Sequence, residues 1–277
     1  MKRFLLISIA LLAGLALIVG CEKSSEPEPE PDTFDPPTNI AYVTYQDSVK
    51  ITWSVSEDDT ANGFAGYLVY RRENAGFSGL SETDLAALLA QGSPVTGTEI
   101  TITGLASDKK HYFAVRSIAI DGSDTTLSDL SSTIHTSPTI WFSDTIYKVE
   151  YSESAFCAID FDNQVIYPME LSYLTHINIY LGLNTSSRLS LRSPDLYSSE
   201  WREAEVKRLG GGATSVAEFG SAGSSGWSSE AEVYPGDVYA IKTGSHYSKV
   251  FVESIIGASV GIAFTAAYQN VEDYDRF

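Results

Sequence analysis

The stretch GYLVYRR at residues 66–72 decides the fold of the first half of this 277-residue chain. Its aromatic and β-branched side chains favour an extended strand. Upstream, VKITW at residues 49–53 alternates apolar and polar side chains, so that its apolar side chains share one face of a second strand. Further strand patterns follow at residues 100–105, 111–117 and 128–136. Strands at this spacing, with no long helix between them, predict a β-sandwich over residues 36–137.

This set of strands resembles a fibronectin type III domain. The matching pieces are PP at 36–37, ITW at 51–53, GYLVYR at 66–71, ITGL at 102–105 and YFAVRS at 112–117. The resemblance implies a sandwich with a corner tyrosine that bonds to the backbone. In this register the corner falls on His111. The corner hydrogen bond is therefore either missing or remade by the imidazole.

The first domain also contains an insertion at residues 73–98. Within it, SETD at residues 81–84 is typical of a capping box, because Ser81 and Asp84 can each bond the backbone of the other. Three leucines at helical spacing follow, and Gly92 ends the pattern. We expect a helix of about two to three turns with a structural role.

Residues 138–277 predict a second β domain, of less recognisable type. Strand patterns lie at residues 140–151, 156–161, 176–183, 189–192, 238–243, 247–255 and 260–269. A Gly- and Ser-rich stretch at residues 209–229 predicts a mobile loop. The expected fold class is therefore all-β, with a second antiparallel sandwich or rolled sheet after the first.

The N-terminal stretch indicates where the chain resides. Lys2 and Arg3 precede an apolar run that ends in IVGC at residues 18–21, a pattern typical of a secretory signal. IVGC resembles the lipobox of bacterial lipoproteins. The resemblance implies a signal peptide at residues 1–20, cleavage between Gly20 and Cys21, and attachment of fatty acyl chains such as palmitate to Cys21.

The next residues, 21–35, alternate Glu and Pro and predict an extended acidic tether. Lys23 stands where an aspartate would resemble an inner-membrane retention signal. We therefore expect a lipid anchor in the outer membrane, and the sequence leaves open whether the protein faces the periplasm or the cell surface.

Charge and cysteine content narrow the classes of function. Acidic residues number 36 and basic residues 18, for a net charge of -18. This balance argues against nucleic-acid binding, because little would neutralise phosphates. Apart from Cys21 the chain has one cysteine, Cys157, whose apolar neighbours predict a buried side chain.

A few residues of the second domain are ligand candidates. The tail, with PGDVYAIKT at 235–243 and AYQ at 267–269, resembles the C-terminal strands of HmuY-like surface lipoproteins, some of which bind haem through paired histidines. His176 and His246 are the histidines available for such a pair. Exposed Trp201 or Trp227, with Tyr197 nearby, would instead stack on sugars. We predict no bound cofactor and no metal.

The sequence offers little for catalysis. It lacks a G-x-S-x-G elbow, an H-E-x-x-H pair and a phosphate-binding loop. Asp160 and Asp162 share a strand face about 7 Å apart, a separation seen in glycosidases, but carboxylates at strand ends are usually solvated. We therefore expect no enzyme but a binding or spacer module for a protein or glycan. The alternatives are an HmuY-like haem or small-ligand binder and, after it, an accessory of a carbohydrate-active enzyme or a hydrolase.

Overall fold

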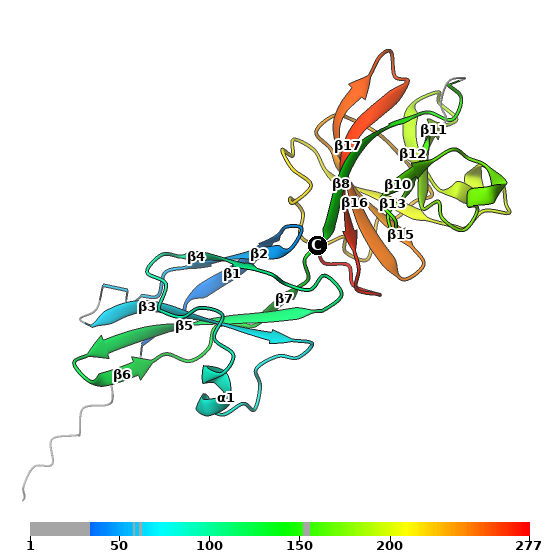
Figure 1. Cartoon of the computed structure of the whole chain (residues 1–277). Helices are drawn as coiled ribbons and strands as arrows, with labels where there is room; N and C mark the ends of the chain where they lie inside the picture. The colour runs from blue at the N-terminus through cyan, green and yellow to red at the C-terminus, as the bar shows by residue number, and fades with distance from the viewer. Residues whose placement is uncertain (1–33, 58, 61–62, 152–155) are drawn as a thin grey trace, which may run out of the picture. The chain divides into compact units, whose positions relative to one another are not determined.

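The computed structural model describes residues 34–277, apart from 58, 61–62 and 152–155 (Figure 1). The signal, lipobox and most of the tether predicted at residues 1–33 lie outside the described residues. No helix within the described ranges is long and apolar enough to cross a membrane.

The first domain is a sandwich of two antiparallel sheets. One sheet has the order β1-β2-β4, formed by β1 (Thr38–Thr44), β2 (Ser48–Ser54) and β4 (Glu99–Thr103). The other contains β3 (Phe64–Glu73), β5 (His111–Asp121), β6 (Asp124–Leu127) and β7 (Ile134–Thr136). The fibronectin type III-like fold predicted for this part of the chain is confirmed.

The core of the first sandwich follows from the alternation in β2 and β3. Val49, Ile51 and Trp53 are buried between the sheets, where the Trp53 ring packs edge-on to Tyr67 at 5.4 Å between centroids. Gly66, in β3, has a φ of +127°, and a Cβ there would lie 2.5 Å from the Val95 carbonyl oxygen. Glycine at this position thus allows residues 88–95 to pair with the edge of β3.

The corner hydrogen bond of the first sandwich is remade by the imidazole. His111 is fully buried, and its Nε2 bonds to the Ala106 carbonyl at 2.9 Å. Burial lowers the pKa of His111, which favours the neutral ring.

The helix in the insertion is shorter than the sequence predicts. Helix α1 (Glu82–Ala86) has five residues, and the capping box between Ser81 and Asp84 is confirmed. Leu85 is buried, whereas Leu88 and Leu89 lie past the helix in a segment that pairs with β3. Pairing to the strand edge replaces the expected last turns of helix.

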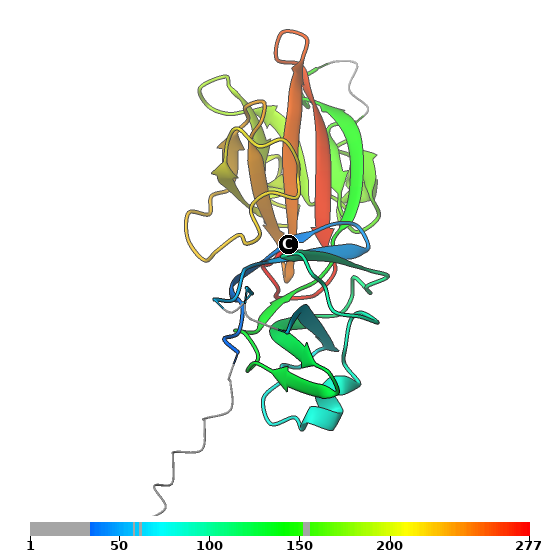
Figure 2. The ribbon, with the colours of Figure 1, turned by 90° about the vertical axis from the view of Figure 1, so that its left-hand side faces the viewer.

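The second domain is also a sandwich, and its antiparallel class is confirmed. One five-stranded sheet contains β10 (Val165–Tyr167), β9 (Ala158–Asp160), β11 (Ile179–Leu183), β12 (Leu189–Arg192) and β14 (Glu230–Glu232). The other contains β13 (Glu205–Gly210), β15 (Val238–Thr243), β16 (His246–Ile256), β17 (Gly261–Gln269) and β8 (Ile140–Tyr147). In Figure 2, β16 and β17 (orange to red) run side by side.

The main core of the second sandwich lies between its two sheets, among residues such as Phe161, Leu191 and Phe264. A smaller cluster lies against the β10-β9-β11-β12-β14 sheet, where two short 3-10 helices, η1 (Leu171–Tyr173) and η2 (Pro194–Leu196), interrupt the loops. Cys157 belongs to this cluster, and its predicted burial is confirmed.

A loop follows strand β13, as predicted for residues 209–229, and part of it packs against the sheet. Strand β13 runs to Gly210, and the residues after it pack against β15 and β16, with Val216 and Ala222 buried. The Lys249 ammonium, itself fully buried, donates to the carbonyls of Glu218 at 2.9 Å and Phe219 at 3.2 Å. Glycine allows close packing at Gly210, where a Cβ would lie 2.5 Å from the Phe219 ring.

Candidate functional site

The side chains of Asp160 and His176 lie in contact at the end of β9. The carboxylate of Asp160 is fully buried and accepts from the Asn163 backbone N–H at 3.0 Å and from its side-chain amide at 2.8 Å. The His176 Nδ1 lies 3.3 Å from Asp160 Oδ2, and about half of the His176 side chain is exposed. The prediction that the Asp160 carboxylate is solvated is therefore wrong. Its contact with Nδ1 orients the His176 imidazole, and the Nε2 atom takes no part in this contact.

Arg202 fixes the backbone beside this pair. Its Nε donates to the Ile177 carbonyl at 2.6 Å, and its Nη2 donates to the His176 carbonyl at 2.7 Å. Burial lowers the pKa of this guanidinium, and the carboxylates of Asp160 and Asp162 oppose that shift. The role of Arg202 was not predicted, because nothing in the local sequence pattern links it to Ile177, which lies 25 residues upstream.

His246 belongs to a neighbouring contact rather than to the Asp160–His176 pair. Its ring stacks on Tyr268 at 5.6 Å between centroids. The Tyr268 hydroxyl is bonded to Asp162, and burial together with this carboxylate raises the pKa of Tyr268 well above its usual range. Each of the two histidines thus has its own partner. Within the described residues, no three His, Cys, Asp or Glu side chains are placed to hold a metal ion.

The two tryptophans predicted as exposed sugar platforms are both covered. Trp201 is only 4% exposed and packs with Met169 and Ile177 in the smaller cluster. Trp227 is half-buried against the sheet, where its Nε1 donates to the Gly223 carbonyl at 3.2 Å and Lys207 lies over its ring. Exposure of Trp201 is therefore a wrong prediction, because the loops around η1 and η2 cover its ring.

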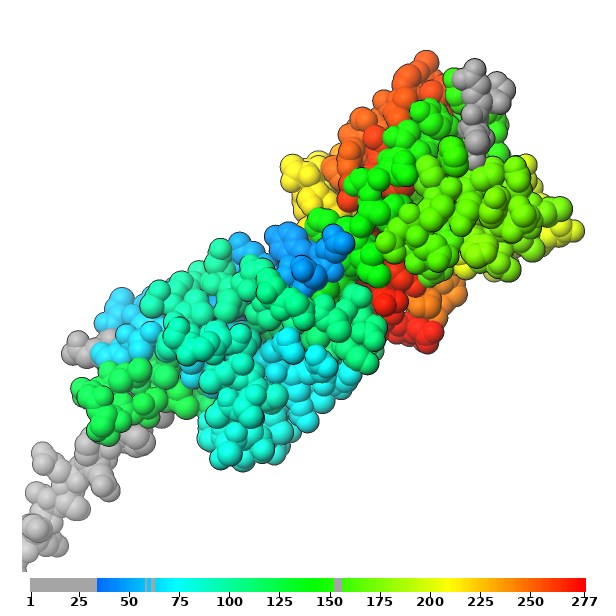
Figure 3. Space-filling model, in the orientation of Figure 1, coloured from blue at the N-terminus to red at the C-terminus, as the bar shows by residue number. Residues whose placement is uncertain are grey.

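Exposed apolar side chains are frequent instead in this part of the sequence. Of nine large apolar side chains exposed in the described residues, five fall between residues 156 and 197. We define the aromatic rim as Tyr167, Leu171, Tyr173, Leu196 and Tyr197. Figure 3 shows the yellow-green stretch that carries these residues forming much of the near surface of the second sandwich.

The aromatic rim is built on the smaller cluster. The rings of Tyr167 and Tyr173 stack at 4.3 Å, and both pack against that cluster. Tyr197, which is 49% exposed, meets Trp201 edge-on at 6.2 Å. Leu171, at the start of η1, is 68% exposed. The rim thus presents apolar surface held by buried rings underneath, which suits binding by contact rather than by enclosure.

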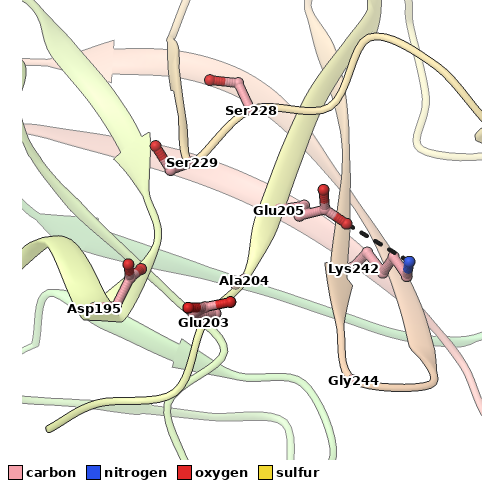
Figure 4. A pocket seen from close by; sticks show the side chains of 8 residues that line it. All are labelled: Asp195, Glu203, Ala204, Glu205, Ser228, Ser229, Lys242 and Gly244. Carbon is pink, nitrogen blue, oxygen red and sulfur yellow. Dashed lines mark ion pairs between the residues drawn. The ribbon is translucent and has the colours of Figure 1, made fainter. Parts of the chain in front are cut away.

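A separate cleft of about 470 Å³ lies beside the β15–β16 turn (Figure 4). Its polar lining is mostly acidic: Asp195, Glu203 and Glu205 contribute carboxylates, and Lys242 pairs with Glu205 at 3.6 Å. Ser228 and Ser229 complete its polar lining. The chemistry of this cleft suits attraction of cations, but no general base and nucleophile meet among its described residues.

Comparison with known proteins adds the following. No protein-family model and no curated protein sequence matches this chain. Among solved structures, a titin module, A71 from human cardiac muscle, is 22% identical, with 38% of this chain and 92% of that chain covered and a TM-score of 0.28. A structure described as a myokine is 18% identical over 38% of this chain and 97% of that chain, also with a TM-score of 0.28. Likenesses of this size carry no argument about function.

Proposed function

We propose that this chain is a lipid-anchored protein of the bacterial outer membrane whose second sandwich binds a protein or glycan without catalysis. The N-terminal apolar run followed by IVGC at residues 18–21 supports the anchor. The observation that carries the binding role is the aromatic rim, where Leu171 and Tyr197 expose apolar surface on loops that are fixed from below. Exposed apolar patches of this kind mark interaction sites.

The anchor is tested by Cys21→Ser, because cleavage and acylation both need the thiol. We expect the wild type to partition into detergent with the outer membrane and to incorporate radiolabelled palmitate. The variant should remain an unprocessed precursor or become soluble, and should take up no label. Unchanged partitioning, mobility and labelling of the variant would contradict the anchor.

The binding role is tested on a glycan array and by binding to purified outer-membrane proteins. We expect Tyr197→Ala and Leu171→Ala each to reduce the signal of any specific hit at least fivefold, because each removes exposed contact area. Tyr234→Ala is the matched control, since Tyr234 is also about half exposed but lies outside the rim. A hit that is equally weakened by Tyr234→Ala, or by none of the three, does not use the rim.

The second candidate is haem or small-ligand binding through His176. The Asp160–His176 pair favours it, because a carboxylate on one imidazole nitrogen is the usual partner of a ligating histidine. Haemin added at micromolar concentration should then give a sharp Soret band that is lost in His176→Ala and, for bis-imidazole ligation, also in His246→Ala. Weak binding that neither substitution changes would leave the aromatic rim as the binding surface.

A further inference from the structure

Strand β4 of the first sandwich has a free edge. It pairs with β2 on one side, in a register that sets Ile51 opposite Ile100. The Trp53 N–H bonds to the Thr98 carbonyl at 3.0 Å. Because backbone groups alternate sides along an antiparallel strand, residues 98, 100 and 102 point theirs at β2. The N–H and C=O groups of Thr101 and Thr103 therefore point outward.

Nothing in the described part of the chain bonds these outward groups of Thr101 and Thr103. Two other edge strands carry devices that discourage pairing. Strand β1 has a register shift and a left-handed Asn39 (φ 51°), and β13 has a register shift at its end. Strand β4, with the sequence EITIT, carries no register shift, proline or lysine.

A second free backbone edge faces the same space. The Arg71 N–H bonds to the Leu88 carbonyl at 2.9 Å, and the Ala90 N–H bonds to the Val69 carbonyl at 2.8 Å. Leu89, the residue between them, therefore directs its own N–H and C=O away from β3. Its side chain is 38% exposed.

The two edges border a cleft of about 450 Å³. Leu88, Leu89 and Ala90 form one wall, and Thr101 and Thr103 form the other. Arg71 is the charged side chain that lines it, and its contact with Glu73 is long, at 3.4 Å. Most of its donors are thus available to a carboxylate.

We propose that this cleft binds an extended peptide segment of a partner protein, which adds as a strand to the free edge of β4. An extended backbone presents N–H and C=O groups at the spacing that Thr101 and Thr103 require, which a glycan does not. Its side chains alternate between solvent and the wall formed by Leu88 and Ala90, so small apolar residues fit there. An acidic residue at one end of the segment complements Arg71.

This surface lies in the first sandwich and is independent of the aromatic rim, so failure of one proposal leaves the other standing.

The test uses the full chain in detergent and a fluorescent, capped heptapeptide of alternating valine and threonine that ends in glutamate. Thr101→Pro removes one outward N–H without removing a bond to β2, and we expect it to weaken binding at least tenfold. Thr101→Val keeps the N–H and nearly the same shape, so binding should stay within twofold of the wild type. Replacing the glutamate of the peptide by glutamine should weaken binding to the wild type but not to Arg71→Gln.

Two measurements on the unaltered protein keep the test valid if Thr101→Pro fails to fold. The peptide should slow hydrogen exchange at the Thr101 and Thr103 amides at least tenfold. A peptide N-methylated on the residues that face β4 should not bind. Binding unaffected by N-methylation, absence of saturable binding, or protection at other strands only would overturn the proposal. Dimerisation in light scattering that Thr101→Pro abolishes would assign the edge to a second copy instead, and would also overturn it.

Discussion

The two sandwiches differ in how they bury polar side chains. In the first, most buried polar groups are neutral and bind nearby backbone: His111 bonds to the Ala106 carbonyl, and the hydroxyls of Ser128 and Ser131 accept from strand β5. The exception is Arg116 in β5, which is 6% exposed and pairs with Glu82 of α1 at 2.8 Å. In the second, the buried groups include ionisable side chains. Asp160 and Lys249 are both fully buried, and each is bonded to a loop outside the sheets.

This difference has a physical consequence for the loops. A buried charge is costly unless several hydrogen bonds compensate it, so each such group fixes the segment that supplies those bonds. Asp160 fixes the turn at Asn163 and the ring of His176, and Lys249 fixes the glycine-rich segment at residues 218–219. The first sandwich thus uses one buried charge, Arg116, to hold α1, and neutral groups elsewhere, whereas the second holds two loops with fully buried ionisable groups.

The largest expected effect is a loss of stability that distinguishes the core of the first sandwich from that of the second. Trp53→Ala should lower the free energy of unfolding of the first sandwich by about 3–5 kcal/mol, because a large buried ring leaves a cavity. Urea denaturation of the full chain, followed by fluorescence and by amide exchange in each sandwich, measures it. Trp227→Ala is the matched control and should cost less, since that ring is half-buried. Equal effects of the two substitutions would contradict the core assigned to Trp53.

The burial of Trp53 can be predicted from the sequence, through the alternation of apolar and polar side chains in residues 49–53. Such alternation does not reveal every strand. Period-two alternation identified most of the longer strands, and β12 and β15 have the predicted bounds. It missed the seven-residue β1, and the strand predicted at residues 128–136 is confined to β7. It missed β10 and β14, which have three residues each and no room for a period, and it missed β13, which leads into the Gly- and Ser-rich stretch.

The candidate site was predicted only in part, for a related reason. His176 and Asp160 were both singled out, but their pairing joins segments 16 residues apart through a turn that no periodicity encodes. Trp201 was expected at the surface, because sequence cannot show that η1 and η2 fold over it. Lys249 would likewise be expected in solvent, since nothing local indicates that residues 218–219 cover it.

The second expected effect is a pH dependence specific to the second sandwich. Burial lowers the pKa of Lys249 to about 7 in the folded protein, whereas its unfolded value is about 10.4. Between these values the unfolded state binds more protons, so the contribution of Lys249 to stability rises with pH, by at most about 1.4 kcal/mol per pH unit.

Lys249→Met removes this titration. We therefore expect the stability of the wild type relative to Lys249→Met to increase from pH 7 to pH 9 in urea denaturation. Lys242→Met is the control, because Lys242 lies on the adjacent strand but remains partly exposed. A difference that stays constant over this range would contradict a buried amine at position 249.

The third effect is an acid sensitivity of the first sandwich. Burial lowers the pKa of His111, so its folded pKa lies below the unfolded value of about 6.5. The unfolded state takes up a proton first as pH falls through about 6.5, and stability is lost from there downward. His111→Tyr places a tyrosine, the corner residue of fibronectin type III domains, at this position and removes the titration.

We expect His111→Tyr to stay within about 1 kcal/mol of the wild type at pH 7.5, since one hydrogen bond replaces another. At pH 5 it should be the more stable of the two proteins by urea denaturation. His135, whose pKa burial also lowers, is present in both proteins and cancels in the difference. If both proteins lose the same stability between pH 7.5 and pH 5, the acid sensitivity does not come from His111.

The smallest effect concerns the capping box of the first sandwich. The Ser81 hydroxyl accepts from the Asp84 N–H at 3.2 Å, and the Asp84 carboxylate accepts from the Ser81 N–H at 3.1 Å. Ser81→Ala removes the first bond, which at a helix N-cap typically contributes about 1 kcal/mol. Because α1 has only five residues and lies outside both sheets, the loss should be confined to it and to the Leu88–Ala90 wall that follows.

Native-state hydrogen exchange resolves such a local loss. The Leu85 N–H, bonded to the Ser81 carbonyl at 2.9 Å, and the Leu88 N–H, bonded to Leu85, should exchange about fivefold faster in Ser81→Ala. Amides of β5 should exchange at the wild-type rate. Ser78→Ala, an exposed serine outside the box, should change neither. If Ser81→Ala accelerates exchange throughout both sheets, then α1, which the Arg116–Glu82 pair ties to β5, is part of the framework of the first sandwich.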